Sequence, residues 1–414
     1  MKDNCIVAQS GGPTVAINAS LAGVIDGVKK SNKFTRVYGA IHGIQGVLDN
    51  NFIDLSLMAL SKFPLVNTLE LSPAMYLGSC RYKLPDFEVD SKPYEIIFDR
   101  FEEYQVAAFF YIGGNDSMDT VDKLSKYANK IGSDVKIVGI PKTIDNDLPL
   151  PANAPTFGYN SAKNEGAHIA RTIYEDARTS GNWLVISAMG RTCGSLALGI
   201  GEATHCPMTI IPEMFNKTQM TLEKIIRLSI SAILKRKIMG VNYGTIVAAE
   251  GLFHNEEVAK EAADAGVHFT YDEHGHPELG KISKAVLFNE LLEKEFKKIG
   301  LKVKSRPVEI GYDVRCQDPV AYDLTYCTEL AMGVYQLFSE GKTGCMVYVD
   351  SYGNVSPLYL ADLQDPETGK IPPRIVDINA GTAQNYYNYI AHYVTPEDYE
   401  AVKALGIADP SVYD

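Results

Sequence analysis

The sequence has little cysteine and no long hydrophobic run. Its seven cysteines, at positions 5, 80, 193, 206, 316, 327 and 345, never form a C-x-x-C pair. We therefore expect a reducing compartment, the cytoplasm, and no structural zinc site. No stretch approaches the roughly 18 consecutive apolar residues of a membrane helix, and no apolar h-region follows Met1. We accordingly expect neither a signal peptide nor a membrane span.

Positive charge is also in short supply. The chain has 39 Lys and Arg against 51 Asp and Glu, which gives a net charge of −12. This balance argues against binding to nucleic acid or to an anionic membrane. It also means that any phosphate would have to be held by local cations. With 414 residues, 46% of them hydrophobic, the chain is long enough for two globular domains.

The most informative stretch contains two short turns, each preceded by an apolar run of strand length. Gly113-Gly114-Asn115-Asp116-Ser117 follows the run 107–112, and Pro141-Lys142-Thr143-Ile144-Asp145-Asn146-Asp147 follows the run 135–140. Between them, apolar residues recur at helical spacing. A right-handed βαβ unit would place both turns at the carboxyl edge of a parallel sheet, where open α/β folds bind ligands.

The two turns differ in chemistry. Gly113 and Gly114 let the backbone approach an anion closely, the helix that follows directs free N–H groups at it, and Ser117 is expected to cap that helix. In the second turn, Asp145 and Asp147 place like charges at one edge, which is costly unless a cation or a proton transfer uses them. Lys142 supplies one positive partner.

Other strand ends carry candidate binding residues of the same kind. A Gly-Gly turn with Gly12 follows the strand 5–8, and a Gly78-Ser79-Cys80 turn precedes Arg81. Met189-Gly190-Arg191 follows the strand 183–188, and Glu250 follows the strand 245–249. Each of these is also compatible with an ordinary turn or a solvated loop charge.

Together the two turns resemble the phosphofructokinase family, and within it the pyrophosphate-dependent branch. The resemblance extends from Gln9 to about Val349, and Glu309–Arg315 resembles the family's Leu-Gly-Tyr-x-x-Arg with Ile310 in place of leucine. It implies a phosphoryl transfer between pyrophosphate and the 1-hydroxyl of fructose 6-phosphate, with Mg²⁺ as cofactor. It further implies a homodimer or homotetramer that acts in glycolysis. Its binding partners would be pyrophosphate and fructose 6-phosphate, with neither nucleic acid nor membrane among them.

The family also implies roles for individual residues. Asp145 would be the general base and Asp147 would orient it or support Mg²⁺, with Lys142 and Asp116 completing the catalytic group. Donor phosphates would bind at Gly12, Arg81, Gly114, Asn115 and Ser117, and the metal at Asn115 and Asp116. Fructose 6-phosphate would bind at Thr143, Asp145, Met189, Gly190, Arg191, Glu250, Tyr312 and Arg315.

Four departures from the family pattern qualify these roles. Asn115 stands where the family usually has aspartate, so one metal contact loses its charge. Asn182 stands where ATP-dependent bacterial members keep an arginine for the sugar phosphate, and Leu324 occupies a second such arginine position. Ala22 and Asp26 replace arginines that bind nucleotide effectors in those enzymes, so we expect no such regulation.

The expected fold is α/β, with two doubly wound domains, mainly parallel sheets and a cleft between them. Residues 1–157, completed by 325–375, would bind the donor. Residues 158–324, joined by the tail 376–414, would bind fructose 6-phosphate. The crossing at 149–157 is marked by Pro149, Pro151 and Pro155.

Three alternative functions stay open. The same reaction with ATP is the nearest, but ATP-using relatives have glycine where this chain has Asp116 and Lys142. Those two residues could instead form a bracing salt bridge. A non-catalytic sugar-phosphate-binding subunit is disfavoured by the retained Asp145. A Rossmann dehydrogenase is disfavoured because no G-x-G-x-x-G follows the first strand. His274-Gly275-His276 is expected to be an exposed turn rather than a metal pair.

Overall fold

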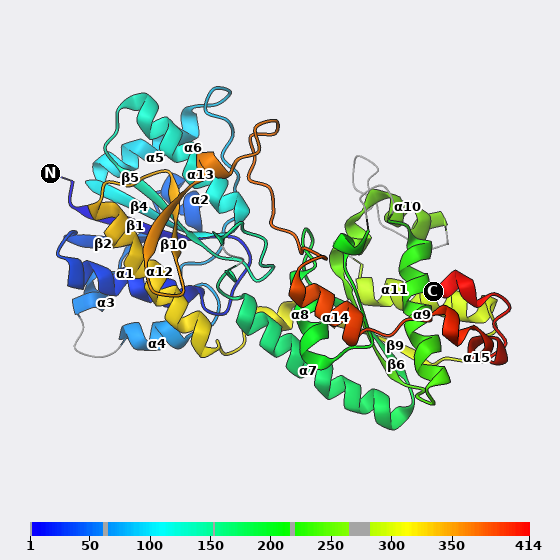
Figure 1. The fold of residues 1–414 in the computed structure, drawn as a ribbon. Helices are drawn as coiled ribbons and strands as arrows, with labels where there is room; N and C mark the ends of the chain where they lie inside the picture. Colours follow the sequence, from blue (N-terminus) through cyan, green and yellow to red (C-terminus); the bar gives the residue numbers. More distant parts are fainter. Residues whose placement is uncertain (1, 61–64, 152–153, 216–219, 265–281) are drawn as a thin grey trace. The chain divides into compact units, whose positions relative to one another are not determined.

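The chain divides into two compact units, each built from two separate stretches of sequence. The computed structural model describes residues 2–60, 65–151, 154–215, 220–264 and 282–414 (Figure 1). His274-Gly275-His276 lies outside these described residues. The first unit comprises Met1–Ala162 and Arg315–Arg374, and the second comprises Lys163–Val314 and Ile375–Asp414. The boundaries expected from the sequence were 157/158, 324/325 and 375/376.

The first unit is organised around a seven-stranded sheet in the order β11-β10-β5-β4-β1-β2-β3. All neighbouring strands are parallel except for the edge pairs β2–β3 and β10–β11. The strands are β1 (Asn4–Gln9), β2 (Arg36–Ala40), β3 (Phe52–Asp54), β4 (Val106–Gly113), β5 (Lys136–Pro141), β10 (Cys345–Val349) and β11 (Val355–Tyr359).

Helices cover both faces of this sheet (Figure 1). Consecutive residues of a strand point to opposite faces, and in β4 Phe110 packs into one core while Phe109 packs into the other. Burial on both sides explains why β4 is a continuous apolar run. The helices of this unit are α1 (Ile17–Ser31), α2 (Gly43–Leu48), α3 (Ser56–Leu60), α4 (Leu65–Leu71), α5 (Lys92–Glu103), α6 (Asn115–Ile131), α12 (Ala321–Ser339) and α13 (Leu360–Leu363).

The second unit has a smaller, fully parallel sheet in the order β7-β8-β6-β9. Its strands are β6 (Trp183–Ala188), β7 (Met208–Ile210), β8 (Gly244–Ala249) and β9 (Ser305–Ile310). Its helices are α8 (Ser195–Thr204), α9 (Leu222–Ile238), α10 (Glu256–Asp264), α11 (Lys284–Lys298), α14 (Gly381–Tyr389), α15 (Tyr399–Ala404) and most of α7 (Tyr159–Ser180). Short 3-10 turns occupy Pro212–Met214, Glu250–His254, Tyr312–Arg315, Pro396–Asp398 and Pro410–Tyr413.

The expected α/β class and mainly parallel sheets are confirmed. The central prediction of strand, glycine turn, helix, strand and acidic turn corresponds to β4, α6 and β5. The capping role expected of Ser117 is wrong. Gly114 is the N-cap residue of α6, and Ser117 lies buried in the first turn, where its Oγ hydrogen bonds to Ser10 Oγ. A tertiary contact therefore uses the hydroxyl that the local pattern assigned to capping.

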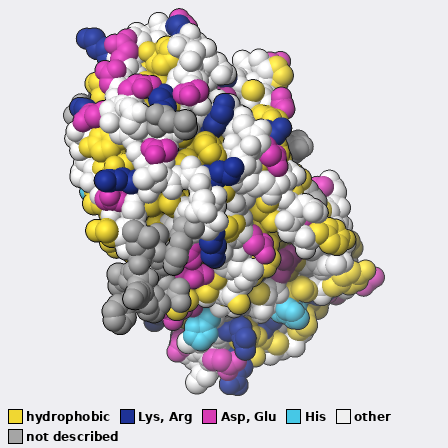
Figure 2. Space-filling view, turned by 90° about the vertical axis from the view of Figure 1, so that its left-hand side faces the viewer, with side chains coloured by type: hydrophobic (Ala, Val, Ile, Leu, Met, Phe, Trp, Pro, Cys, Tyr) yellow, Lys and Arg dark blue, Asp and Glu magenta, His cyan; other side chains and the backbone are white. Residues whose placement is uncertain are grey.

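The C-terminal tail, Ile375–Asp414, packs onto the rest of the second unit. The Tyr386 hydroxyl donates a hydrogen bond of 2.7 Å to the carbonyl oxygen of Cys206, and Val394, Val402 and Tyr413 join the same hydrophobic cluster as α9. On the face drawn in Figure 2, acidic and basic side chains are interspersed. Among the described residues, no helix combines the length and the apolar character needed to cross a membrane.

Candidate active site

Three turns of the first unit meet at the carboxyl ends of β1, β4 and β5. The parallel register pairs Gln9 with Ile112 and Gly113 with Pro141, so these strands end side by side. The Lys142 N–H donates a hydrogen bond of 2.9 Å to the Gly113 carbonyl oxygen, which joins the acidic turn to the glycine turn. The structure therefore brings the turns at Gly12, Gly114 and Lys142 together, as expected for a ligand site at this sheet edge.

Lys142 is a buried cation against the first glycine turn. Its side chain is 5% exposed, and Nζ donates a hydrogen bond of 3.0 Å to the Gly12 carbonyl oxygen. Gly11 has a φ of +82°, and a Cβ added there would lie 3.0 Å from this Nζ. Burial lowers the pKa of Lys142 to about 8. The ammonium group is thus held close to backbone that only glycine can form without crowding.

Two arginines place positive charge near Lys142. A Cβ added at Gly12 would lie 3.4 Å from the guanidinium carbon of Arg315, and positive charge on Arg315 and Arg81 helps to lower the pKa of Lys142. Arg81 itself is exposed. Its loop is anchored because the Gly11 N–H donates a 3.2 Å hydrogen bond to the Cys80 carbonyl oxygen. Arg315, which the family pattern assigns to the sugar phosphate, belongs to the first unit together with Gly12.

The acidic turn supplies the compensating negative charge. The carboxylates of Asp145 and Asp147 both act to raise the pKa of Lys142, against the larger effect of burial. The Asp145 N–H donates a 3.0 Å hydrogen bond to Thr143 Oγ1, and the Asp147 side chain is almost completely buried. Asn146 between them has a φ of 58°, in the left-handed region that asparagine tolerates better than most residues.

Asn115 connects the glycine turn to the acidic turn. Its Nδ2 donates a hydrogen bond of 2.9 Å to Asp147 Oδ2. Its Oδ1 is buried and has no hydrogen-bond partner within the part of the chain that the structure describes. A buried oxygen without a donor is costly, and a bound cation or a protonated ligand would satisfy it. The same described residues contain no cluster of three His, Cys, Asp or Glu side chains able to enclose a metal by themselves.

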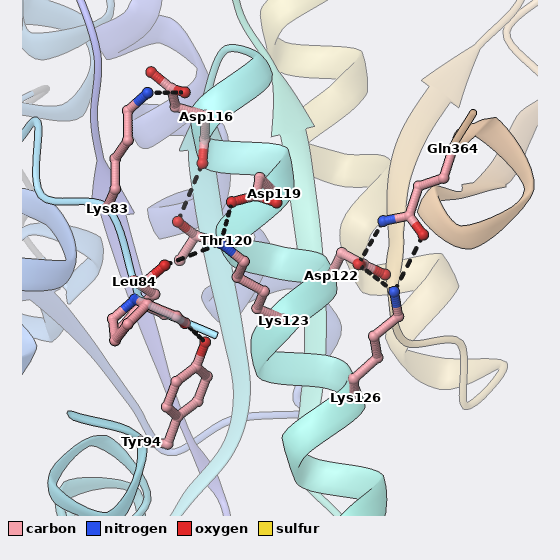
Figure 3. A network of polar contacts seen from close by, with 11 residues as sticks. Lys83, Leu84, Tyr94, Asp116, Asp119, Thr120, Asp122, Lys123, Lys126 and Gln364 are labelled. Atoms are coloured by element: carbon pink, nitrogen blue, oxygen red, sulfur yellow. Dashed lines mark hydrogen bonds and ion pairs between the residues drawn. The ribbon is translucent and has the colours of Figure 1, made fainter. Parts of the chain in front are cut away.

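Asp116 does not pair with Lys142. Its carboxylate forms a 2.9 Å ion pair with Lys83, and both side chains are largely exposed (Figure 3). The bracing salt bridge considered from the sequence is therefore not formed. One turn further along α6, Lys123 pairs with Asp119 at 2.7 Å and donates to the Leu84 carbonyl oxygen at 2.9 Å. The segment that follows Arg81 is thus fastened to α6 at two points.

In the second unit, the structure brings Gly190 and Glu250 together. The Gly190 N–H donates a 3.3 Å hydrogen bond to Glu250 Oε1, and the Gly251 N–H donates a 3.2 Å hydrogen bond to the Gly190 carbonyl oxygen. Gly190 has a φ of +127°, which excludes most other residues. Met189 is half-buried and Arg191 is exposed in the same turn. The carboxyl ends of β6 and β8 therefore form a second candidate binding edge.

The neighbouring strand β9 adds Tyr312 and brings a residue that the motifs missed. The Met189 N–H donates a 3.2 Å hydrogen bond to the Ile310 carbonyl oxygen, and the Tyr312 side chain just beyond is 79% exposed. Burial lowers the pKa of Lys284, whereas the carboxylates of Glu250 and Glu309 raise it. Lys284 lies at the start of α11 in a charged stretch, where no local pattern distinguishes it from its solvated neighbours.

A cavity of about 760 Å³ lies at the opposite, amino-terminal edge of this second sheet. Its lining includes Trp183, Lys237, Lys302 and Arg306, and no predicted site residue belongs to it. This cavity is therefore separate from the candidate site, whose residues lie at the carboxyl ends of the strands.

Comparison with known proteins agrees with this arrangement. The phosphofructokinase family model matches residues 4–338, so the chain belongs to the phosphofructokinase family. It is 30% identical over 409 residues to the pyrophosphate--fructose 6-phosphate 1-phosphotransferase of Naegleria fowleri, covering 96% of this chain and 90% of that protein. The enzyme of the same name from Thermotoga maritima is 30% identical, with 92% and 88% coverage.

Solved structures show the same fold. The crystal structure of pyrophosphate-dependent phosphofructokinase from Nitrosospira multiformis superposes with a TM-score of 0.69 at 23% identity, covering 98% of this chain and 92% of that one. The phosphofructokinase of Saccharomyces cerevisiae gives a TM-score of 0.66 over 87% of this chain. The family resemblance drawn from the two turns is confirmed.

Proposed function

We propose that this protein transfers a phosphoryl group between pyrophosphate and the 1-hydroxyl of fructose 6-phosphate, reversibly and in the cytoplasm, as a homodimer or homotetramer. The observation that carries the proposal is the buried Lys142 ammonium group, which lies against the Gly11-Gly12 turn and is flanked by the charges of Asp145, Asp147, Arg81 and Arg315. Phosphoryl transfer needs this combination of anion cradle, cations and carboxylates, because its catalysis is mainly alignment and charge neutralisation.

Within the proposal, the acidic turn handles the proton. Asp145 accepts the proton of the 1-hydroxyl as that oxygen bonds to the donor phosphorus, while the bridging P–O bond of pyrophosphate breaks and phosphate leaves. The hydroxyl of Thr143 accepts a hydrogen bond from the Asp145 N–H and so orders the backbone at the base. Asp147 is buried and its carboxylate accepts a hydrogen bond from Asn115, so we assign it to orienting the turn. In the reverse direction, Asp145 returns the proton to the leaving sugar oxygen.

The donor phosphates bind at the glycine turns. Backbone N–H groups around Gly12 and Gly114 approach the phosphate oxygens, with Ser117 supporting that turn from behind, and Lys142, Arg81 and Arg315 supply positive charge. These local cations overcome the net charge of −12. The sugar phosphate is assigned to Met189, Gly190, Arg191, Glu250 and Tyr312 of the second unit. The family pattern gives Arg315 the same ligand.

Mg²⁺ fits the donor side of this site. The unpartnered Asn115 Oδ1 and the adjacent Asp147 carboxylate provide hard oxygen ligands, and Asp116 follows in sequence. Mg²⁺ commonly takes only one or two protein carboxylates and completes its shell with water and substrate phosphates. When bound, it would neutralise charge on the phosphates, and Asn115, Asp147 and Asp116 would hold it.

The donor is tested by comparing pyrophosphate with ATP. We expect the purified full-length chain, with Mg²⁺, to form fructose 1,6-bisphosphate rapidly from pyrophosphate and at most slowly from ATP in an aldolase-coupled assay. Higher turnover with ATP would establish the ATP-dependent alternative. Binding of fructose 6-phosphate without turnover on either donor would establish the non-catalytic alternative.

A further inference from the structure

One side chain from far along the sequence contacts the acidic turn at several points. Arg374 lies in the segment that follows α13, outside the residues matched by the family model. Its Nε donates a 3.0 Å hydrogen bond to the Asn146 carbonyl oxygen, and its Nη1 donates a 2.8 Å hydrogen bond to the Ala154 carbonyl oxygen. Nη2 donates to Asn146 Oδ1, and the Arg374 N–H donates a 2.8 Å hydrogen bond to the Asp147 carbonyl oxygen.

These contacts fix the backbone on both sides of Asp147. The Asn146 carbonyl belongs to the peptide group before Asp147, and the Asp147 carbonyl belongs to the peptide group after it. Arg374 binds both, so neither peptide plane can rotate without breaking a hydrogen bond. The direction of the Asp147 side chain is therefore set by Arg374 as well as by Asn115.

The hydrogen-bond network of Arg374 extends toward Asp145 through Asn146. Asn146 Oδ1 also accepts a 3.0 Å hydrogen bond from the Thr156 N–H, and Thr156 Oγ1 donates a 2.7 Å hydrogen bond to the Thr143 carbonyl oxygen. Arg374 and Thr156 thus hold the amide side chain of Asn146 between them, and Asn146 is itself the residue in the left-handed conformation. Asp145 lies within this braced loop, between Thr143 and Asn146.

The choice of arginine has a physical reason. A guanidinium group presents several donors in a planar fork and stays charged at any ordinary pH, whereas a lysine ammonium has no fork and reaches fewer fixed acceptors. Hydrogen bonds from a charged donor are also stronger than neutral ones. The turn contains two carboxylates of like charge, so a permanent cation behind its backbone favours this conformation over one in which they move apart.

We propose that Arg374 is a positioning residue for the proposed reaction, holding Asp145 and Asp147 in the geometry that turnover requires without touching either substrate. The inference rests on the proposed function. A displacement of about 1 Å at a reacting group costs about 10²-fold in rate. We expect the loss of Arg374 to lower kcat rather than raise KM. Its hydrogen bonds go to Asn146, Asp147 and Ala154, and not to the proposed phosphate-binding cations Lys142 and Arg81.

The experiment compares Arg374→Lys, Arg374→Ala and wild type as full-length enzymes with pyrophosphate. We expect kcat to fall about 10²-fold in Arg374→Ala and at least about 10-fold in Arg374→Lys, with each KM within about threefold of wild type. Millimolar guanidinium should partly restore kcat in Arg374→Ala by filling the vacated site, and should leave Arg374→Lys unchanged. A kcat within threefold of wild type in folded Arg374→Lys would overturn the proposal.

Two further variants separate positioning from stability. Arg236 donates a 2.9 Å hydrogen bond to the Tyr243 carbonyl oxygen in the second unit, so Arg236→Lys is a matched control that should lower Tm and leave kcat unchanged. Asn146→Gly keeps the left-handed backbone and removes the shared Oδ1, and it should lower kcat about 10-fold even if Arg374→Ala does not fold. A loss of Tm with normal kcat in Asn146→Gly and Arg374→Lys would assign Arg374 a structural role only. A wild-type enzyme that is inactive with pyrophosphate would refute the proposed function. The ratio of kcat in each variant to kcat in wild type tests the positioning role of Arg374.

Discussion

Lys142 Nζ lies 3.0 Å from the carbonyl oxygen of Gly12 and is almost fully buried, although the two residues are 130 positions apart in the chain. Burial lowers the pKa of this group to about 8, while Asp145 and Asp147 oppose the shift. Because we propose that this cation binds the donor phosphates, we expect donor binding to be sensitive to pH.

The first prediction concerns this pH dependence. Lys142 carries its proton below its pKa and loses it above, so kcat/KM for pyrophosphate should be level below about pH 8 and fall above it. Arg stays protonated, so Lys142→Arg should lose this falling limb even if its activity is lower. Initial rates across pH, at fixed Mg²⁺-pyrophosphate, measure the effect. An identical limb in Lys142→Arg would show that another group titrates.

The second prediction concerns the base. Asp145→Asn removes the proton acceptor but preserves the size of the side chain, so kcat should fall by about 10²- to 10⁴-fold. Calorimetric titration with fructose 6-phosphate should show binding close to that of wild type. Asp119→Asn, on the exposed side of α6, is the matched control and should keep full turnover. Near-normal turnover in a folded Asp145→Asn enzyme would remove Asp145 from this role.

The third prediction concerns donor choice. Asp116 puts a carboxylate beside the glycine turn, where it would repel the α-phosphate of a nucleotide, and Lys83 holds it in place. Asp116→Gly should therefore gain measurable ATP use. Asp119→Gly removes a similar ion pair one turn away on α6 and should not gain ATP use. The ratio of kcat/KM for ATP to that for pyrophosphate is the measurement, and an unchanged ratio in Asp116→Gly would assign donor choice elsewhere.

The fourth prediction concerns Arg315. The proposed charge-assisted contact to the sugar phosphate predicts that Arg315→Ala raises KM for fructose 6-phosphate by about 10- to 100-fold. The proximity of Arg315 to Gly12 offers a clear alternative outcome. If KM for pyrophosphate rises instead and KM for the sugar stays constant, Arg315 serves the donor.

The fifth prediction concerns regulation. Ala22 is buried on α1 and Asp26 is half-buried there, so this stretch of helix offers no cation to a nucleotide effector. We expect hyperbolic kinetics in fructose 6-phosphate, with no response to ADP or phosphoenolpyruvate. A shift in half-saturation on adding either compound would contradict this.

The sequence predicted the parts of the site that depend on local pattern. Apolar runs, glycine turns and helical spacing identified β4, α6 and β5. The proximity of Gly12, Gly114 and Lys142 was also predictable, because each follows a strand and the carboxyl ends of parallel strands meet at one edge of the sheet. The Ser117 cap failed because a tertiary partner, Ser10, competes for the hydroxyl.

Side-chain partnerships between distant segments were not predictable. The partner of Asp116 is Lys83 rather than Lys142, a choice set by where the loop after Arg81 returns to α6. Arg374 could not be recognised because most of its acceptors are backbone carbonyls, which every residue has. Neither the sequence around Arg374 nor that around Asn146 indicates their pairing.

The order in which the two units are assembled follows from the discontinuous path of the chain. Strand β10 pairs with β5, and α12 packs on α1, yet both belong to residues 315–374, which are synthesised after the second unit's main stretch. During synthesis, β5 is therefore an edge strand without its neighbour β10 for as long as Lys163–Val314 is being made. A fragment that ends at residue 162 should aggregate when expressed alone, and the acidic turn takes its final form only after Arg374 has emerged.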